Sequence, residues 1–301
     1  MRDYIYLAFY HLFRWLVTWT PEKILFPILR GIARFVWFID RKHRRIARVN
    51  LDLAFGDEMS DEEKERIIRR TYENLVFNLA DFIRNQGISK EKLLQKVSFE
   101  NSEYVENELK AGRPIIAITA HYGHWELLPP ALAAKFTPLT IVGRPLDSKA
   151  MNEILERNRE RFDIKLLPKK GALKGLISAL KKGRSVGLLV DQNTREKDGI
   201  LIDFFGKKAR HTPAAAILAR RLDLKIVPVF IHSDDHRHYV IKFYPPITME
   251  KTNDKDADII RSVQAQAKIT EVVIREKPDE WFWLHQRWKN QYKHLYETRS
   301  R

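Results

Sequence analysis

The chain has 301 residues, and 54 Lys and Arg against 39 Asp and Glu give it a formal net charge of +15. Hydrophobic residues make up 44% of it and cysteine is absent. This composition excludes a disordered chain, a disulfide scaffold, a cysteine-ligated metal site and a thiol nucleophile. What remains is a basic globular protein whose partner is expected to be anionic: a nucleic acid, a membrane surface or an acidic substrate.

The first 50 residues are both basic and rich in large apolar side chains, with ten basic residues against three acidic ones. The runs 4–19 and 26–39 mix aromatic residues with arginines, which suits helices at the headgroup boundary of a membrane. Neither run has the cleavage site of a secretory signal. The first is also shorter than the ~20 apolar residues of an ordinary spanning helix, although whether it crosses the bilayer stays open. The alternative is a soluble helical bundle with one aromatic face.

Residues 60–95 have the pattern of a pair of soluble helices. Ser60 followed by Glu63 is a capping box, and apolar residues from Ile67 to Ile83 recur near the helical period. We therefore expect residues 1–95 to form a helical, membrane-associating extension, and residues 96–301 to form a second unit of a different class.

In that second unit, short apolar runs alternate with helical patterns. This alternation predicts an α/β fold with a mainly parallel central sheet flanked by helices. Ligands of such sheets bind outside the carboxyl ends of the strands, so the residues just after Ala120, Gly143 and Val190 should converge on one site. The expected strands are 114–120, 139–143, 164–167, 185–190, 225–231 and 239–243, the last antiparallel, and the expected helices are 125–135, 148–161, 172–182, 212–221 and 256–275.

His121 directly follows the first of these strands, and Glu126 lies five residues later. Gly123 between them permits a turn that would bring the carboxylate to the imidazole. A carboxylate there fixes the tautomer of the ring and stabilises the imidazolium, and the pair would be a general base for a hydroxyl. An isolated His-x4-Glu is more often a capping or buried histidine, but its position among other polar strand ends favours catalysis.

Other chemistries have weaker support. No G-x-S-x-G, G-x-G-x-x-G or Walker loop occurs, which argues against a serine elbow and a nucleotide cofactor. H-E-x-x-H is absent too, and the histidines and aspartates of 232–238 are better explained as a solvated turn than as a metal site. We expect neither a metal nor any other cofactor.

Seven segments together resemble the late acyltransferase family of lipid A biosynthesis, bacterial membrane enzymes of the wider H-x4-D/E acyltransferase class. They span nearly the whole chain in order. One departure is His124, where the family commonly has Asn. The segments are RVNLDLAF (48–55), AHYGHWE (120–126), GRP (143–145), LLVDQN (188–193), DFFGKKARHTP (203–213), VPVF (227–230) and EWFWLHQRWKN (280–290).

The resemblance implies transfer of a fatty acyl chain from acyl carrier protein to a hydroxyl of a lipid A precursor of the Kdo-lipid IVA type. The reaction would take place at the cytoplasmic face of the bacterial inner membrane. Coenzyme A is the alternative acyl donor. His121 would take the proton of the attacking hydroxyl while Glu126 orients the ring. Backbone N–H groups near Gly123 are candidates to bind the oxyanion.

Four further residues are expected to bind substrate. Arg144 could hold a phosphate of the acceptor or of the carrier's phosphopantetheine, because a guanidinium forks well onto phosphate. Asp191 and Gln192 would shape the pocket or hold a sugar, with a purely structural role equally open. Arg287 would meet lipid headgroups, unless it lies on a solvated basic helix.

Three alternatives remain. The first is an acyltransferase of the same family that acts on another lipid, such as a mannosylated phosphoinositide or a lysophospholipid. The second is a nucleic-acid-binding protein, but the densest basic cluster, 41–48, adjoins an apolar aromatic segment and so favours a membrane over nucleic acid. The third is a non-catalytic membrane scaffold, against which the intact His121 and Glu126 weigh.

Overall fold

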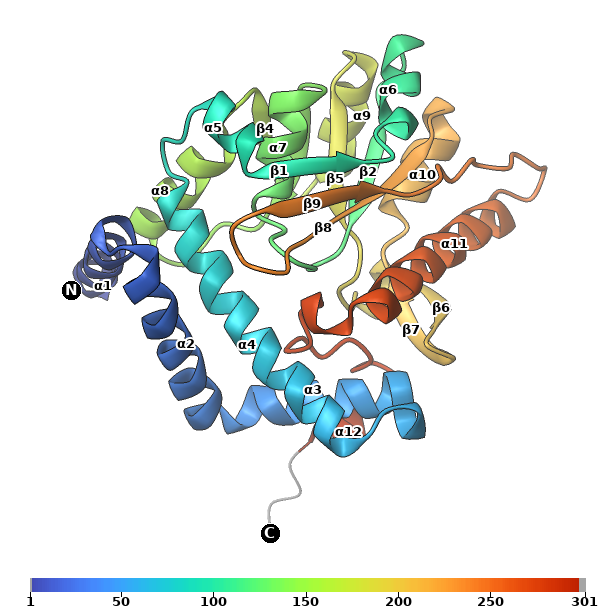
Figure 1. Ribbon diagram of the computed structural model, residues 1–301. Helices are drawn as coiled ribbons and strands as arrows, with labels where there is room; N and C mark the ends of the chain where they lie inside the picture. Colours follow the sequence, from blue (N-terminus) through green and yellow to red (C-terminus); the bar gives the residue numbers. More distant parts are fainter. Residues whose placement is uncertain (1, 298–301) are drawn as a thin grey trace.

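A seven-stranded, mostly parallel sheet lies at the centre of the structure, a computed structural model that describes residues 2–297 (Figure 1). Its strand order is β1-β9-β8-β2-β5-β3-β4. The predicted α/β fold with a mainly parallel sheet is confirmed, as is the antiparallel pairing of β9 with β8. The strands are β1 (Val97–Glu100), β2 (Ile116–Thr119), β3 (Leu139–Gly143), β4 (Ile164–Pro168), β5 (Ser185–Leu189), β8 (Ile226–His232) and β9 (Tyr239–Phe243).

The two faces of the sheet are covered by different helices. On one face, Ile116 and Ile118 of β2 join a core with α9, α10 and α11, while Ala117 points to the other face and packs with α7. β2 is buried throughout because it pairs with β5 on one side and β8 on the other. These helices are α6 (Glu103–Lys110), α7 (Leu128–Lys135), α8 (Lys149–Arg159), α9 (Ala172–Lys181), α10 (Ala214–Leu222) and α11 (Lys255–Glu276).

Five helices precede the first strand. Ser60 caps α4 as predicted, its hydroxyl accepting a hydrogen bond from the Glu63 N–H at 3.2 Å. α4 lies diagonally across the molecule with α2 beside it, and α3 contributes to the main core around Trp283. The division at residue 95 stays a prediction. The helices are α1 (Arg2–Trp19), α2 (Glu22–Ile39), α3 (Arg41–Phe55), α4 (Asp61–Arg84) and α5 (Lys90–Gln95).

α1 and α2 expose an unusual number of large apolar side chains. On α2 they recur at 24, 28, 35, 38 and 39, a spacing that places them along one face of the helix. The basic side chains of Arg14, Lys23 and Arg34 are exposed on the same two helices. The exposed apolar residues are Tyr4, Ile5, Tyr6, Phe9, Leu12, Trp15, Trp19, Ile24, Ile28, Phe35, Phe38 and Ile39.

No helix within residues 2–297 has both the length and the apolar character needed to cross a bilayer.

Several elements differ from the sequence prediction. Strand β1 and the hairpin of β6 (Ile200–Phe204) and β7 (Lys207–His211) were not expected, whereas the pair of helices predicted for 60–95 is confirmed as α4 and α5. Helix α7 begins at Leu128 rather than Trp125, because the segment before it makes tight turns instead of helix. The remaining elements are the short helix α12 (Lys293–Tyr296) and three 3₁₀ turns, η1 (Gly56–Glu58), η2 (Glu196–Asp198) and η3 (Pro278–Glu280).

Candidate active site

His121 and Asp191 meet at the carboxyl edge of the sheet. They come from adjacent parallel strands whose register pairs Thr119 with Leu189, so each residue lies two positions beyond the paired ends. The His121 Nδ1 atom is 2.9 Å from Asp191 Oδ1, and the backbone N–H of His121 donates to Asp191 Oδ2 at 3.1 Å. The indole N–H of Trp281 donates to the same Oδ2 at 2.9 Å. The carboxylate is thus fixed by three donors.

The electrostatics of this pair favour a charged carboxylate and a basic imidazole. Asp191 is buried, which by itself raises its pKa, but the charge and hydrogen bonds of His121 and Trp281 outweigh burial and hold the pKa well below its usual range. Burial also lowers the pKa of His121, yet the adjacent Asp191 charge raises it by more, so the net shift is upward. The ring is therefore a stronger base than an ordinary histidine.

The other ring nitrogen of His121 is available for chemistry. A carboxylate can only accept hydrogen bonds, so the Nδ1 atom that contacts Asp191 carries the ring proton. The Nε2 atom then has a free lone pair that can accept a proton or a hydrogen bond. The side-chain nitrogen of Gln192 lies 3.3 Å from Nε2, at the position where an acceptor hydroxyl would donate. The His121 side chain keeps 19% of its surface exposed, and the rings of Trp125 and Phe282 flank it at 5.4 and 6.3 Å.

Glu126 does not hold His121, contrary to the sequence prediction. Its carboxylate forms a forked ion pair with Arg159 of α8, at 3.0 Å to Nε and 2.5 Å to a terminal nitrogen. Within residues 2–297 no hydrogen bond joins Glu126 to His121, although the Glu126 charge contributes to raising the pKa of the imidazole. The reason is local: residues 121–127 are not helical, and a rigid guanidinium matches a carboxylate better than one imidazole nitrogen does.

Gly123 sets the path of this segment. It has a φ of +56°, and a Cβ built on it would lie 1.7 Å from the carbonyl oxygen of Ile231, so no other residue fits. Its N–H donates to the Glu280 carbonyl at 2.9 Å and its carbonyl accepts from the Asn78 side chain at 2.7 Å. The Gly123 N–H is therefore already engaged, and the prediction that backbone N–H groups near Gly123 bind the oxyanion stays a prediction for its neighbours.

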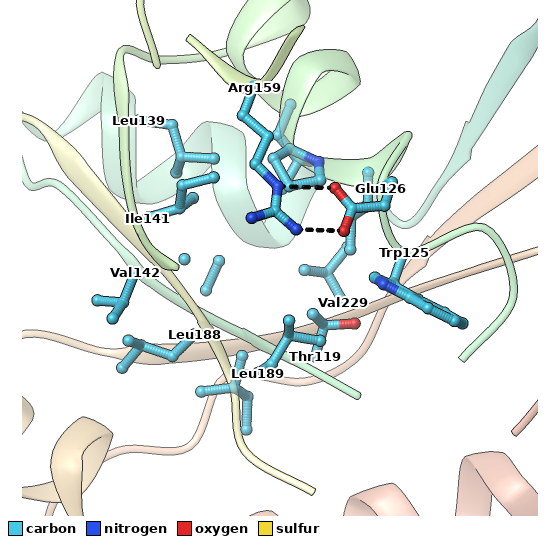
Figure 2. Close-up of a pocket in the computed structure, with 16 residues that line it drawn as sticks. Thr119, Trp125, Glu126, Leu139, Ile141, Val142, Arg159, Leu188, Leu189 and Val229 are labelled. Atoms are coloured by element: carbon cyan, nitrogen blue, oxygen red, sulfur yellow. Dashed lines mark hydrogen bonds and ion pairs between the residues drawn. The ribbon is translucent and has the colours of Figure 1, made fainter. Parts of the chain in front are cut away.

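An apolar pocket lies between the sheet and α7. Figure 2 shows the Glu126–Arg159 pair at one side of it and leucine, isoleucine and valine side chains around the rest. Trp125, which contacts His121, also lines the pocket. The lining residues are Ala117, Ile118, Thr119, Trp125, Glu126, Leu128, Pro129, Leu132, Leu139, Ile141, Val142, Arg159, Gly187, Leu188, Leu189 and Val229.

Arg144 and Arg287 have opposite environments. Arg144 follows β3 and is exposed, and its guanidinium forms no ion pair within the described residues, so it remains a candidate to bind an anion. Arg287 is fully buried, lies over the ring of Phe204 and donates to the Arg210 carbonyl. The prediction that Arg287 meets headgroups is wrong, because the segment 281–292 is an irregular stretch packed into the core by Trp283 and Trp288 instead of a surface helix.

Two residues of the site were not singled out from the sequence. Arg159 falls within the expected helix 148–161, and Trp281 within the segment EWFWLHQRWKN (280–290) that carries the resemblance. Their spacing from His121 gives no signal, because Arg159 reaches the site from α8 and Trp281 from the segment after η3, where it forms an isolated β-bridge with Tyr122. In the part of the chain from 2 to 297, no three His, Asp or Glu side chains are grouped so as to hold a metal ion.

Comparison with known proteins matches the chain, over residues 1–290, to the family described as bacterial lipid A biosynthesis acyltransferase. The chain belongs to this family, and it is an acyltransferase. It is 24% identical over 277 residues to the lipid A biosynthesis lauroyltransferase of Escherichia coli K12, covering 91% of this chain and 88% of that protein. The lipid A biosynthesis palmitoleoyltransferase of the same organism is 23% identical over 279 residues, covering 91% and 89%.

Among solved structures, the chain is similar to the crystal structure of the 1-acyl-sn-glycerophosphate acyltransferase from Thermotoga maritima. The TM-score is 0.39 with 15% sequence identity, covering 85% of this chain and 100% of that one. A similarity at this level supports no inference about the site.

Proposed function

We propose that this acyltransferase moves a fatty acyl chain from a carrier-protein thioester to a hydroxyl of a lipid A precursor of the Kdo-lipid IVA type. One observation carries the proposal: His121, whose Nδ1 is held by Asp191, contacts Trp125, and Trp125 lines a pocket made mostly of aliphatic side chains. A base for a hydroxyl and a site for a hydrocarbon chain are the two parts that acyl transfer to an alcohol requires.

The proposed reaction is a direct attack. The acceptor hydroxyl replaces the Gln192 amide at His121 Nε2 and gives its proton to that nitrogen as its oxygen bonds to the thioester carbonyl carbon. Collapse of the tetrahedral intermediate breaks the C–S bond, and the imidazolium returns the proton to the departing sulfur. Asp191 stabilises the transient imidazolium and keeps the ring in the required tautomer.

The acyl chain would occupy the pocket on the α7 side of the sheet. Glu126 and Arg159 form its polar side, so we propose that they position the thioester end while the aliphatic residues hold the tail (Figure 2). Glu126 thus keeps a place in the site, but as the partner of Arg159 and a remote source of negative charge for His121.

We propose that α1 and α2 lie on an anionic membrane surface, in a bacterium the cytoplasmic face of the inner membrane. The support is the apolar stripe exposed on these helices, with arginines and a lysine around it. Aromatic side chains insert at the headgroup level, and each basic residue near an anionic surface adds ~1 kcal/mol. A lipid acceptor then reaches the enzyme by diffusion in the membrane. Arg144 would bind one of the anionic groups of acceptor or donor.

The test is an assay of the purified protein with an acyl-carrier thioester and a Kdo-bearing lipid A precursor, followed by mass spectrometry of the product. We expect one added acyl ester on a hydroxyacyl chain of the acceptor. In cells that lack the protein, mass spectrometry of lipid A should show one secondary acyl chain missing. Transfer to a lysophospholipid or a mannosylated phosphoinositide, with none to the lipid A precursor, would overturn the proposed acceptor.

A further inference from the structure

The segment 164–182 carries six lysines and not one Asp or Glu. It comprises β4, at the edge of the sheet, and α9, which follows it. All six side chains are exposed, and none forms an ion pair within residues 2–297. The preceding acid, Asp163, is already paired with Arg184 at 2.7 Å. We call Lys165, Lys169, Lys170, Lys174, Lys181 and Lys182 the lysine surface.

The charges on the surface of α11 offer a comparison. There Arg261, Lys268 and Arg275 each have an acidic partner on the same helix. A solvated helix face of this kind mixes both signs, which limits its self-repulsion. In the lysine surface the positive charges repel one another with no acidic residue between them. Such a concentration of positive charge is complementary to an acidic partner.

The lysine surface begins at the same edge of the sheet as the active site. β3 and β4 are parallel and pair Gly143 with Pro168, so Lys169 and Lys170 emerge on the edge that holds His121. In the strand order β2-β5-β3-β4, β4 is three positions from the strand of His121, a spacing of about 14 Å. A partner bound at β4 would thus need a flexible arm of roughly that length to deliver a thioester to the imidazole.

A folded acidic protein fits this surface better than a membrane does. A surface that binds bilayers combines cations with large apolar side chains that insert, and those are gathered on α1 and α2. Within 164–182 Leu173 is the one large apolar residue counted as exposed, at 37%. In Figure 1, α9 lies at the top of the molecule, away from α1 and α2 on the left.

We infer that the lysine surface is the docking site of the acidic carrier protein that presents the acyl thioester, an inference that rests on the proposed function. The lysines steer the carrier to the edge of the sheet. Its prosthetic arm then crosses the ends of β3 and β5, whose residues Ile141, Val142 and Leu189 line the pocket for the chain.

The experiment compares two donors on one acceptor: the acyl-carrier thioester, and the same acyl group on a short pantetheine thiol. The variant Lys169→Glu/Lys170→Glu/Lys174→Glu reverses the charge nearest the active site. We expect its KM for the carrier thioester to rise by about tenfold or more, with a flatter salt dependence. Its kcat/KM for the short thioester should equal that of the unmodified enzyme, because His121 and the pocket are untouched.

A matched control carries the same change of charge elsewhere. Lys90, Lys207 and Lys255 are also exposed and form no ion pair within the described residues, and Lys90→Glu/Lys207→Glu/Lys255→Glu should leave both donors unaffected. An unchanged KM for the carrier thioester in the lysine-surface variant would overturn the docking site. An equal loss of kcat/KM with both donors would overturn it too, as would a variant whose one defect is weaker binding to anionic vesicles. If the unmodified enzyme used neither donor, the proposed function itself would fail, which is a separate result.

Discussion

Asp191 is hydrogen-bonded to His121 across 70 positions of the chain, whereas Glu126, five residues from the same histidine, is ion-paired to Arg159. A mutation can therefore separate two carboxylates with different tasks. Asp191 fixes the imidazole, and Glu126 lines the pocket. The predictions below depend on that separation.

The pH dependence of turnover should report the His121–Asp191 pair. His121 acts as a base when it is neutral, and its pKa is raised above 6.5. We expect kcat/KM to fall as the pH drops through that raised pKa, so the acid limb lies above pH 6.5. In Asp191→Asn the negative charge is gone, the pKa of His121 decreases, and the limb moves to lower pH. A limb that does not move would show that another group titrates.

The width of the pocket should select the acyl chain. Gly187 of β5 lines it, and a Cβ there would come within 3.2 Å of the Ile141 side chain. Gly187→Ala should shift the preference toward shorter chains in a competition between acyl donors of different length. Gly31→Ala on α2, where nothing lies within 4 Å, is the matched control. A preference that stays the same in Gly187→Ala would place the chain elsewhere.

Removal of the apolar stripe should release the protein from membranes. The quadruple variant Phe9→Ser/Trp15→Ser/Phe35→Ser/Phe38→Ser changes residues that are 61–67% exposed, so the fold should be kept. Each inserted side chain stabilises binding by roughly 1–3 kcal/mol, and loss of four should abolish co-sedimentation with anionic vesicles at high salt. Leu146→Ser/Leu201→Ser/Ile260→Ser, at exposed residues elsewhere, controls for lost apolar surface. Retained binding of the quadruple variant would contradict the surface assignment.

The buried carboxylate of Asp81 should tie the active-site segment to α4. Asp81 is 3.3 Å from the Nε2 atom of His124 and is ion-paired with Lys96. Burial raises the pKa of Asp81, but His124 and Lys96 lower it by more, so its net pKa lies below the usual 3.8. Asp81→Asn leaves Lys96 without its carboxylate partner and removes the contact with His124, which should cost about 3–5 kcal/mol of unfolding free energy at neutral pH.

The same pair predicts how stability changes in acid. Because the folded pKa of Asp81 is depressed, its contribution is complete above pH 3.8 and is lost as the pH falls through the folded value. The difference in unfolding free energy between the unmodified protein and Asp81→Asn should therefore shrink below about pH 4. Denaturant titration at a series of pH values measures it. A difference that is small at neutral pH would contradict the structural role.

The sequence predicted most of the central sheet because strands such as β2 and β5 are short apolar runs bounded by polar residues. It did not predict which carboxylate holds His121. Asp191 reaches the ring because β5, the fifth strand along the chain, lies next to β2, and strand order is a property of the whole sheet. The one sequence signal of the hairpin β6–β7 is Gly206 in its turn, where the backbone has a positive φ. Burial of Arg287 depends on the packing of Trp288 and could not be read from its neighbours.

The most direct test of the account compares kcat for Asp191→Asn and Glu126→Gln with that of His121→Ala, in proteins shown to be folded by circular dichroism. His121→Ala should lower turnover by about 10²–10⁴. The account predicts that Asp191→Asn lowers kcat by most of the factor found for His121→Ala, while Glu126→Gln, which loses the ion pair with Arg159, changes KM for the acyl donor more than kcat. Near-normal kcat in Asp191→Asn, with Glu126→Gln as inactive as His121→Ala, would contradict it.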